Sequence, residues 1–183
     1  MTLFRNKYRV DTVRLRNWDY AANGCYFVTI CSAQRRCVFG HISDGRVSLS
    51  RVGEIVADEW QKTPKIRSNV ELDGWVVMPN HMHGVVIINN LNPVEEMGRN
   101  ASPSTNNRFG PLRPGSLQSI INNYKGAVTR RCRSEGIEDF AWQARYWEHR
   151  VRTERDLLSI RHYIESNPMR WVLDHESAEG LWM

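Results

Sequence analysis

The 183-residue chain lacks several features that mark specialised classes of protein. No apolar run is long enough to span a bilayer, and no apolar signal-peptide segment follows the basic N-terminal stretch MTLFRNKYRV. The chain has only 4 cysteines and no CxxC pair, so we expect reduced thiols rather than a disulfide framework or a zinc knot. These absences predict a cytoplasmic protein with no membrane segment, folded as a single domain over residues 1–183.

Negative charge is also in deficit. The chain has 25 Lys and Arg residues against 20 Asp and Glu, and its formal net charge is +5. The arginines are clustered rather than spread along the chain. Clustered arginine favours a polyanionic partner, of which nucleic acid is the commonest, whereas the alternative is an ordinary solvated basic face.

The pattern of apolar residues predicts an alternation of strands and helices. We expect a Ser50 cap on a helix that ends near Pro64, and a Thr153 cap on a last helix that Pro168 closes. Residues 90–115 are rich in Asn, Pro, Gly and Ser and predict a long loop. The expected strands are 25–33, 38–42, 46–50, 70–78, 83–89 and 144–152, and the expected helices are 50–66, 116–132 and 154–167.

Apart from one short hairpin, this order is βαββαβ followed by a last helix. It predicts an α+β fold with a ferredoxin-like antiparallel sheet, helices on one face, and an additional C-terminal helix.

The stretch WVVMPNHMHGVVIIN places His81 and His83 two residues apart in a strand-like segment. Alternate residues of a strand point to the same face, so the two imidazoles should face together while Met82 points into the core. Such a pair could share a metal ion or bind a phosphate, or it could be two structural histidines at the end of a strand. The pair alone does not decide between these interpretations.

Further ligands are sought in the C-terminal segment RHYIESNPMRW. Tyr163 and Asn167 are four residues apart, which places them on one face of a helix, while Glu165 points elsewhere. The amide oxygen of Asn167 could join the two imidazoles on a hard cation. Taken singly, Tyr163 also fits an ordinary aromatic at the core edge, and Asn167 fits a helix end before proline.

Together these segments resemble a known family. MPNHMHG resembles the HUH motif (histidine, hydrophobic, histidine) of single-tyrosine transposases of the IS200-like type. WQARYWEHRVRTERDLLSIRHYIESNP resembles the C-terminal block of the REP-associated tyrosine transposases, and LRNWDYAANGCYFVTICSAQRRCVFGHI resembles their N-terminal strand region. The resemblance covers most of the chain outside residues 90–115, to which no role can be transferred.

The resemblance implies an HUH nuclease fold acting on single-stranded or hairpin DNA. It implies that Tyr163 is the nucleophile, that His81, His83 and Asn167 are the metal ligands, and that the metal is Mg²⁺ or Mn²⁺. Tyrosine attack on a phosphodiester would leave a 5′-phosphotyrosine link and a free 3′-hydroxyl, which permits strand transfer. REP-associated transposases are expected to act as monomers, while a dimer that exchanges the tyrosine helix is known among their relatives.

DNA binding would be the role of basic and aromatic side chains. Trp147, Tyr146 and Trp18 are candidates for stacking on bases, whereas Trp60 and Trp75 fit the core. The arginines expected to contact DNA are Arg14, Arg16, Arg130, Arg131, Arg133 and Arg150.

Two other functions fit part of the pattern. One is a non-catalytic protein that binds hairpin or single-stranded DNA. The other is a metal-dependent phosphodiesterase that uses water, although such sites usually recruit carboxylates. The sequence has no Asp or Glu at ligand spacing from the two histidines, and Glu71 and Asp73 on the preceding strand are the nearest candidates.

Overall fold

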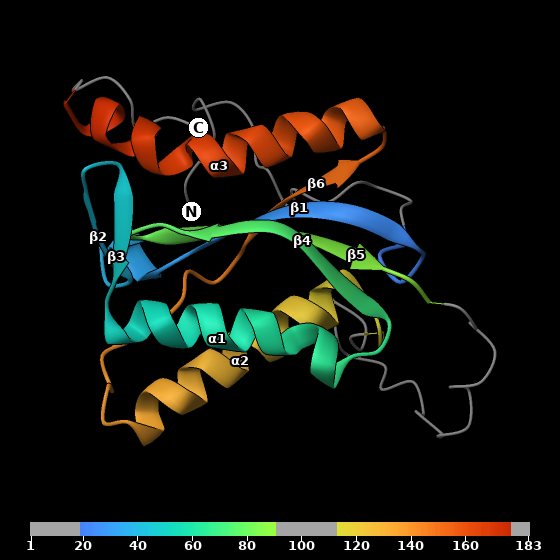
Figure 1. The fold of residues 1–183 in the computed structure, drawn as a ribbon. Coiled ribbons are helices and arrows are strands. Elements are labelled where there is room, and N and C mark those ends of the chain that lie inside the picture. Colours follow the sequence, from blue (N-terminus) through green and yellow to red (C-terminus); the bar gives the residue numbers. More distant parts are fainter. Residues whose placement is uncertain (1–18, 91–112, 177–183) are drawn as a thin grey trace, which may run out of the picture.

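The computed structural model describes residues 19–90 and 113–176. Its centre is a four-stranded antiparallel sheet in the order β4-β5-β1-β6 (Figure 1). Helices α1 and α2 cover one face of the sheet, and α3 lies across the other face. The strands of the sheet are β1 (Gly24–Cys31), β4 (Val70–Val77), β5 (His81–Ile88) and β6 (Trp147–Val151).

The connection of these elements confirms the predicted ferredoxin-like fold. Strands β1, β4, β5 and β6 alternate with α1 (Arg51–Ile66) and α2 (Leu117–Ser134) as βαββαβ, and α3 (Glu154–Glu176) follows. Between β1 and α1, the short 3₁₀ turn η1 (Ala33–Arg35) precedes a hairpin of β2 (Gly40–Ser43) and β3 (Arg46–Leu49). This hairpin contacts α3, so it braces the far end of that helix (Figure 1).

Helix α1 begins with the predicted Ser50 cap, and α2 begins with a similar cap at Ser116 that was not predicted. The Ser50 hydroxyl accepts a hydrogen bond from the Gly53 amide, and the Ser116 hydroxyl accepts one from the Ser119 amide. Such caps satisfy amide groups that have no partner inside the first turn of a helix. Helix α1 continues two residues past Pro64, to Ile66.

The larger core lies between the sheet and these two helices. Trp60 of α1 is fully buried and meets the Tyr124 ring of α2 edge-on, with ring centroids 5.1 Å apart. The Tyr124 hydroxyl lies 3.0 Å from the Val56 carbonyl oxygen and 2.9 Å from Sδ of Met82. Met82 therefore points into this core, as predicted, and is anchored from the helix side.

Gly84 follows the two histidines because Trp60 packs directly on the backbone of β5. A Cβ atom at position 84 would collide with the Trp60 indole ring. Any larger residue would push α1 away from the strand that carries the histidine pair.

The expectation that Pro168 closes the last helix is wrong, because α3 continues through Pro168 to Glu176. Proline removes one amide donor from a helix but does not end it where neighbouring contacts hold both halves. Beyond Pro168 the Trp171 ring lies 5.8 Å from the His81 ring, so the second half of α3 still packs on the sheet. At its start, the Thr153 hydroxyl accepts a hydrogen bond from the Asp156 amide, as expected for its cap.

A second, smaller apolar cluster joins α3 to the sheet. Ile160 and Ile164 pack against Phe27 of β1 and Val85 of β5. Burying each such side chain contributes about 1.5–3 kcal/mol. This cluster fixes the position of the helix that carries Tyr163.

Two predictions lie largely outside the described residues. Most of the predicted 90–115 loop falls in the range 91–112, and Arg14 and Arg16 fall in the range 1–18. Among the helices within the described ranges, none is both long and apolar enough to cross a membrane.

Candidate metal and nucleophile site

His81 and His83 lie at the start of β5 and face α3. Their Nε2 atoms are 3.0 Å apart, and their ring centroids are separated by 4.5 Å. The His83 side of the strand is buried, with His83 only 5% exposed. Strand alternation therefore brings the two imidazoles to one place on the sheet, as the sequence predicts.

Nδ1 of each imidazole has an oxygen partner. Nδ1 of His83 lies 2.9 Å from the Thr29 hydroxyl of β1, and Nδ1 of His81 lies 2.7 Å from Oδ1 of Asn80. An imidazole that donates its Nδ1–H to oxygen presents an unprotonated Nε2. Two such lone pairs 3.0 Å apart repel each other unless a proton or a cation lies near both.

Both imidazoles are held in the neutral form. Burial lowers the pKa of His81 to about 4, and the positive charge of Arg35 adds to the effect. Burial also lowers the pKa of His83 well below its ordinary value, with a further contribution from His81. Neutral imidazole is the form that binds metal ions, so the pair is available as ligands at neutral pH.

Tyr163 of α3 reaches the same place. Its hydroxyl lies 3.4 Å from Nε2 of His83, and the two ring centroids are 5.2 Å apart. Phe27 stacks on His83 at 5.2 Å and meets Tyr163 edge-on at 6.0 Å. A separation of 3.4 Å is longer than a well-formed hydrogen bond, so the hydroxyl faces the imidazole without being tied to it.

Asn167 lies one turn beyond Tyr163 on α3 and is 7% exposed. Its amide makes no hydrogen bond to other residues within 19–90 and 113–176. The Asn167 amide oxygen is therefore available to bind a ligand. The structure places Asn167 on the buried side of α3 with Ile160 and Ile164, and Glu165 on the exposed side, as predicted.

Arg35 is a charged residue near the site that sequence reasoning missed. It lies in η1, directly after β1, and its charge acts on both His81 and the Cys31 thiol. Gln34 and Arg35 have φ angles of 55° and 52°, which non-glycine residues rarely adopt. Strained backbone of this kind clusters at functional sites. The residue types of Gln34 and Arg35 give no sign of it in the sequence.

The two acidic residues of β4 are engaged elsewhere. Both Asp73 oxygens accept hydrogen bonds from Arg161 of α3, at 2.8 and 2.6 Å, and Glu71 accepts one from Asn89. Asp73 and Arg161 also line an open cavity of about 530 Å³ between β4 and α3, which neither histidine lines. In the described part of the chain, no three His, Cys, Asp or Glu side chains are grouped to hold a metal ion.

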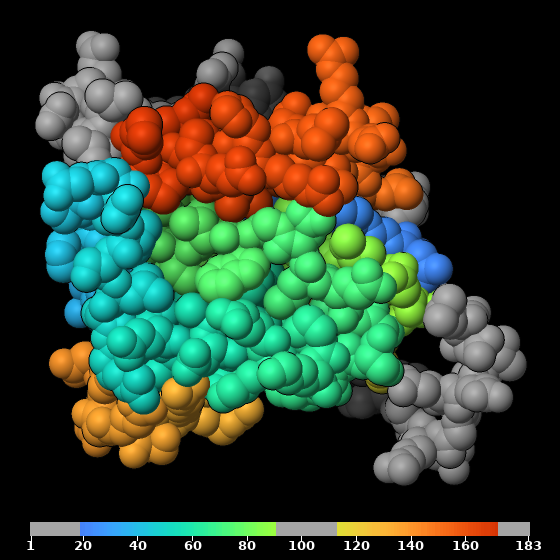
Figure 2. Space-filling view, in the orientation of Figure 1, coloured from blue at the N-terminus to red at the C-terminus, as the bar shows by residue number. Residues whose placement is uncertain are grey.

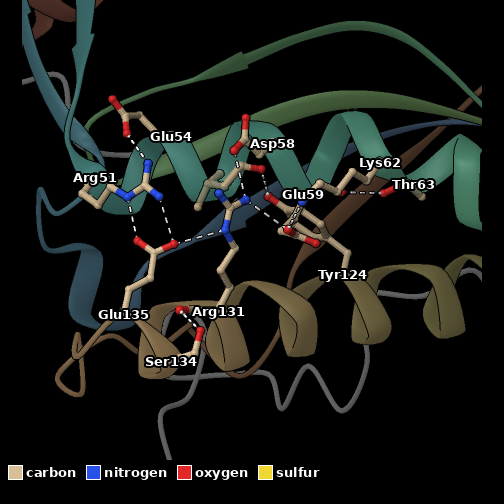
Figure 3. A network of polar contacts seen from close by, with 11 residues as sticks. Arg51, Glu54, Asp58, Glu59, Lys62, Thr63, Tyr124, Arg131, Ser134 and Glu135 are labelled. Carbon is tan, nitrogen blue, oxygen red and sulfur yellow. Dashed lines mark hydrogen bonds and ion pairs between the residues drawn. The ribbon is translucent and has the colours of Figure 1, made fainter.

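The arginines of α2 lie on the opposite side of the sheet from the histidine pair. Arg131 forms ion pairs with Asp58 at 2.9 Å, Glu59 at 3.2 Å and Glu135 at 3.3 Å (Figure 3). Arg51 binds the same Glu135 carboxylate, at 2.6 Å. This network joins α1 to α2, and it uses the charge of Arg131 within the protein rather than leaving it free for DNA.

The other described arginines of the predicted set also lie on the α1 and α2 side of the sheet. Arg130 and Arg133 are on α2, and Arg150 pairs with the core residue Tyr26 across the sheet, on the α1 and α2 face. The DNA-binding role of these arginines stays a prediction. If it is correct, it belongs to a surface separate from the histidines.

The tryptophans divide as expected. Trp60 is fully buried and Trp75 packs against the main core, which confirms both as core residues. Tyr146 also packs against that core, while Trp147 is 48% exposed. Trp18 lies outside the described residues.

The sequence was compared with those of known proteins, and two relatives are informative. A Haemophilus influenzae protein, named only as uncharacterized, is 33% identical over 167 residues, covering 89% of this chain and 90% of that protein. The REP-associated tyrosine transposase of Escherichia coli strain K12 is 27% identical over 104 residues, 56% of this chain and 47% of that protein. No family model matches the sequence.

A solved structure shares the fold. It is a REP-associated tyrosine transposase bound to a REP hairpin, and it superposes with a TM-score of 0.57 at 22% identity. The match covers 87% of this chain and 74% of that one.

Proposed function

This chain belongs to the same family as the Haemophilus influenzae protein and is related to the REP-associated tyrosine transposases. We therefore propose that it is a transposase that cuts and rejoins single-stranded or hairpin DNA. The observation that carries the proposal is the position of the Tyr163 hydroxyl, 3.4 Å from Nε2 of His83. This position puts a possible nucleophile beside two neutral imidazoles that could hold a metal ion, which supports cleavage of a phosphodiester by tyrosine.

In the proposed reaction the Tyr163 oxygen attacks a backbone phosphorus of the DNA. A tyrosine–phosphorus ester forms and the bond from phosphorus to the 3′-oxygen breaks. The phenol proton passes to solvent, and the leaving oxygen takes up a proton as a free 3′-hydroxyl. Because one phosphodiester replaces another, a second 3′-hydroxyl can reverse the attack and complete strand transfer.

The residues present fit a divalent cation such as Mg²⁺ or Mn²⁺. The two Nε2 atoms, 3.0 Å apart, are close enough to bind one ion together. Asn167 would supply the third ligand, and all three ligands would be uncharged.

A cation bound there would hold the scissile phosphate and offset the negative charge of its oxygens during attack. The protein itself orients the imidazole rings and Tyr163. Thr29 and Asn80 fix the imidazole rings, while Ile160 and Ile164 fix the helix that presents Tyr163.

The test is the covalent intermediate. The protein is incubated with 5′- or 3′-labelled hairpin DNA and Mn²⁺ or Mg²⁺ and resolved on a denaturing gel. We expect only the fragment 3′ to the cut to migrate attached to protein, and no adduct with Tyr163→Phe. Tyr20→Phe, which removes a hydroxyl on the opposite side of the sheet, is the matched control.

Two results would contradict the proposal in different ways. Cleavage that persists in Tyr163→Phe would indicate a water nucleophile and a phosphodiesterase. Tight binding of DNA without cleavage by the unmodified protein, with either metal, would indicate a non-catalytic DNA-binding protein.

A further inference from the structure

Trp147 is an exposed aromatic residue beside the site. It is the first residue of β6, the edge strand next to β1, and 48% of it is exposed. Four other large apolar residues of the described ranges are comparably exposed, and all of them are aliphatic: Leu49, Ile66, Leu158 and Met169. Exposed Trp is uncommon without a partner, because its large ring gains much from burial.

Trp147 lies in the same row of the sheet as His83. Thr29 of β1 pairs with His83 on one side and with Trp147 on the other. Two strand spacings of about 4.8 Å separate the two residues across the sheet. Their rings are also linked through Phe27, whose centroid lies 5.2 Å from His83 and 5.8 Å from Trp147.

The indole ring of Trp147 is held in position by two neighbouring rings. Phe27 meets it edge-on at an interplanar angle of 75°, and His149 lies nearly parallel to it, at 8° and 6.2 Å between centroids. His149 is itself fixed by a 2.9 Å hydrogen bond to Asp156 at the start of α3. A ring fixed in this way pays little entropy when a second flat group stacks on it.

We propose that Trp147, braced by Phe27 and His149, is a stacking platform for one unpaired nucleobase of the DNA strand. This rests on the proposed function, since it takes the scissile phosphate to be at His81 and His83. Trp147 lies within about 11 Å of the His83 ring, which is about three nucleotides of a strand stacked at 3.4 Å per nucleotide. The base concerned is therefore within about three nucleotides of the cut.

The platform would select single strands. A base inside a duplex has both faces covered by its neighbours, so it cannot stack on a side chain without leaving the helix. An unpaired base has a free face whatever its identity, so the preference would be for strand type and not for sequence.

The test is a cycle of four affinities, measured by fluorescence anisotropy in the Tyr163→Phe background with EDTA. Labelled oligothymidylate is compared with an abasic oligonucleotide of the same length, for Trp147 and for Trp147→Ala. We expect Trp147→Ala to bind oligothymidylate at least about fivefold more weakly and to bind the abasic strand unchanged. Trp147→Phe should recover part of the affinity, and its melting curve shows whether the strand is intact.

Ile66→Ala is the control, because Ile66 is 72% exposed but lies at the end of α1 on the other side of the sheet. Equal losses for oligothymidylate and the abasic strand, or no loss for either, would overturn the platform. This failure is separate from that of the proposed function. A covalent adduct can form at Tyr163 without a base on Trp147, and the base can bind without an adduct.

Discussion

The Tyr163 hydroxyl lies 3.4 Å from Nε2 of His83, although 80 residues separate the two in the chain. They meet because β5 and α3 pack face to face through a small apolar cluster, and α3 lies directly above the sheet (Figure 2). Both groups belong to the same chain, so one molecule holds the proposed nucleophile beside the proposed metal ligands. The following predictions concern what keeps this relationship in place.

Thr29→Val should weaken metal binding without removing a ligand. The substitution deletes the hydroxyl that lies 2.9 Å from Nδ1 of His83, and with it the group that orients the ring. Loss of such an outer partner typically costs about 10- to 100-fold in metal affinity. Titration with Mn²⁺ followed by electron paramagnetic resonance measures the change, and Thr29→Ser should stay close to the parent. Equal affinities for all three proteins would show that Thr29 does not orient the ligand.

Asn167→Ala should also lower Mn²⁺ affinity, because it removes the proposed third ligand. Asn167→Asp should raise it, since a carboxylate oxygen replaces the neutral amide oxygen on a divalent ion. Isothermal titration calorimetry gives both values. Glu165→Ala, on the exposed side of the same helix, is the control. If Asn167→Ala binds Mn²⁺ like the control, Asn167 is a structural residue and the third ligand lies elsewhere.

The free energy of unfolding of the metal-free protein should fall as the pH drops from about 6.5 to 4. The folded pKa of His81 is about 4 and its unfolded value is near 6.5, so the unfolded chain takes up the proton first. The difference corresponds to about 3 kcal/mol for His81 alone once the pH reaches 4. Urea unfolding in EDTA at several pH values measures this slope.

The control for that slope is His81→Gln, which removes the titrating group and keeps a polar side chain. Its stability should depend less steeply on pH over the same range. Parallel curves for the two proteins would show that burial of His81 does not govern the acid sensitivity.

Asp73→Asn should loosen the attachment of α3 and slow cleavage severalfold. Arg161 donates two hydrogen bonds to the Asp73 carboxylate, and these hold the pKa of Asp73 below its ordinary value. The apolar cluster of Ile160 and Ile164 remains, so the helix should stay folded on the sheet. Hydrogen exchange of α3 amides and single-turnover cleavage rates measure the two effects.

Glu71→Gln on the same strand is the comparison for Asp73→Asn, because Glu71 binds Asn89 and not α3. Exchange in α3 that is as slow in Asp73→Asn as in Glu71→Gln would show that the ion pair does not tether the helix.

Much of this architecture follows from local pattern. The helix caps at Ser50 and Thr153 and the alternation that turns His81 and His83 away from Met82 are properties of a few adjacent residues. Such short-range signals can be read along one dimension. The role of Tyr163 as nucleophile, in contrast, is implied only by the resemblance of the C-terminal block.

What the sequence could not provide depends on contacts between distant segments. Proline usually ends a helix, but Trp171 packs on His81 and α3 continues past Pro168. Arg131 reads as a free cation until α1 brings Asp58 and Glu59 against it. The left-handed turn that carries Arg35 has no glycine to mark it.

Strand β5 contributes to the hydrophobic core with one face and to the candidate site with the other. Met82 is fixed in the core by Tyr124 while its neighbours on both sides face α3. A shift of one residue in the register of β5 against β1 and β4 would turn the methionine toward α3 and both imidazoles into the hydrophobic core. The packing of Met82 in the core therefore also sets the direction in which the two imidazoles point.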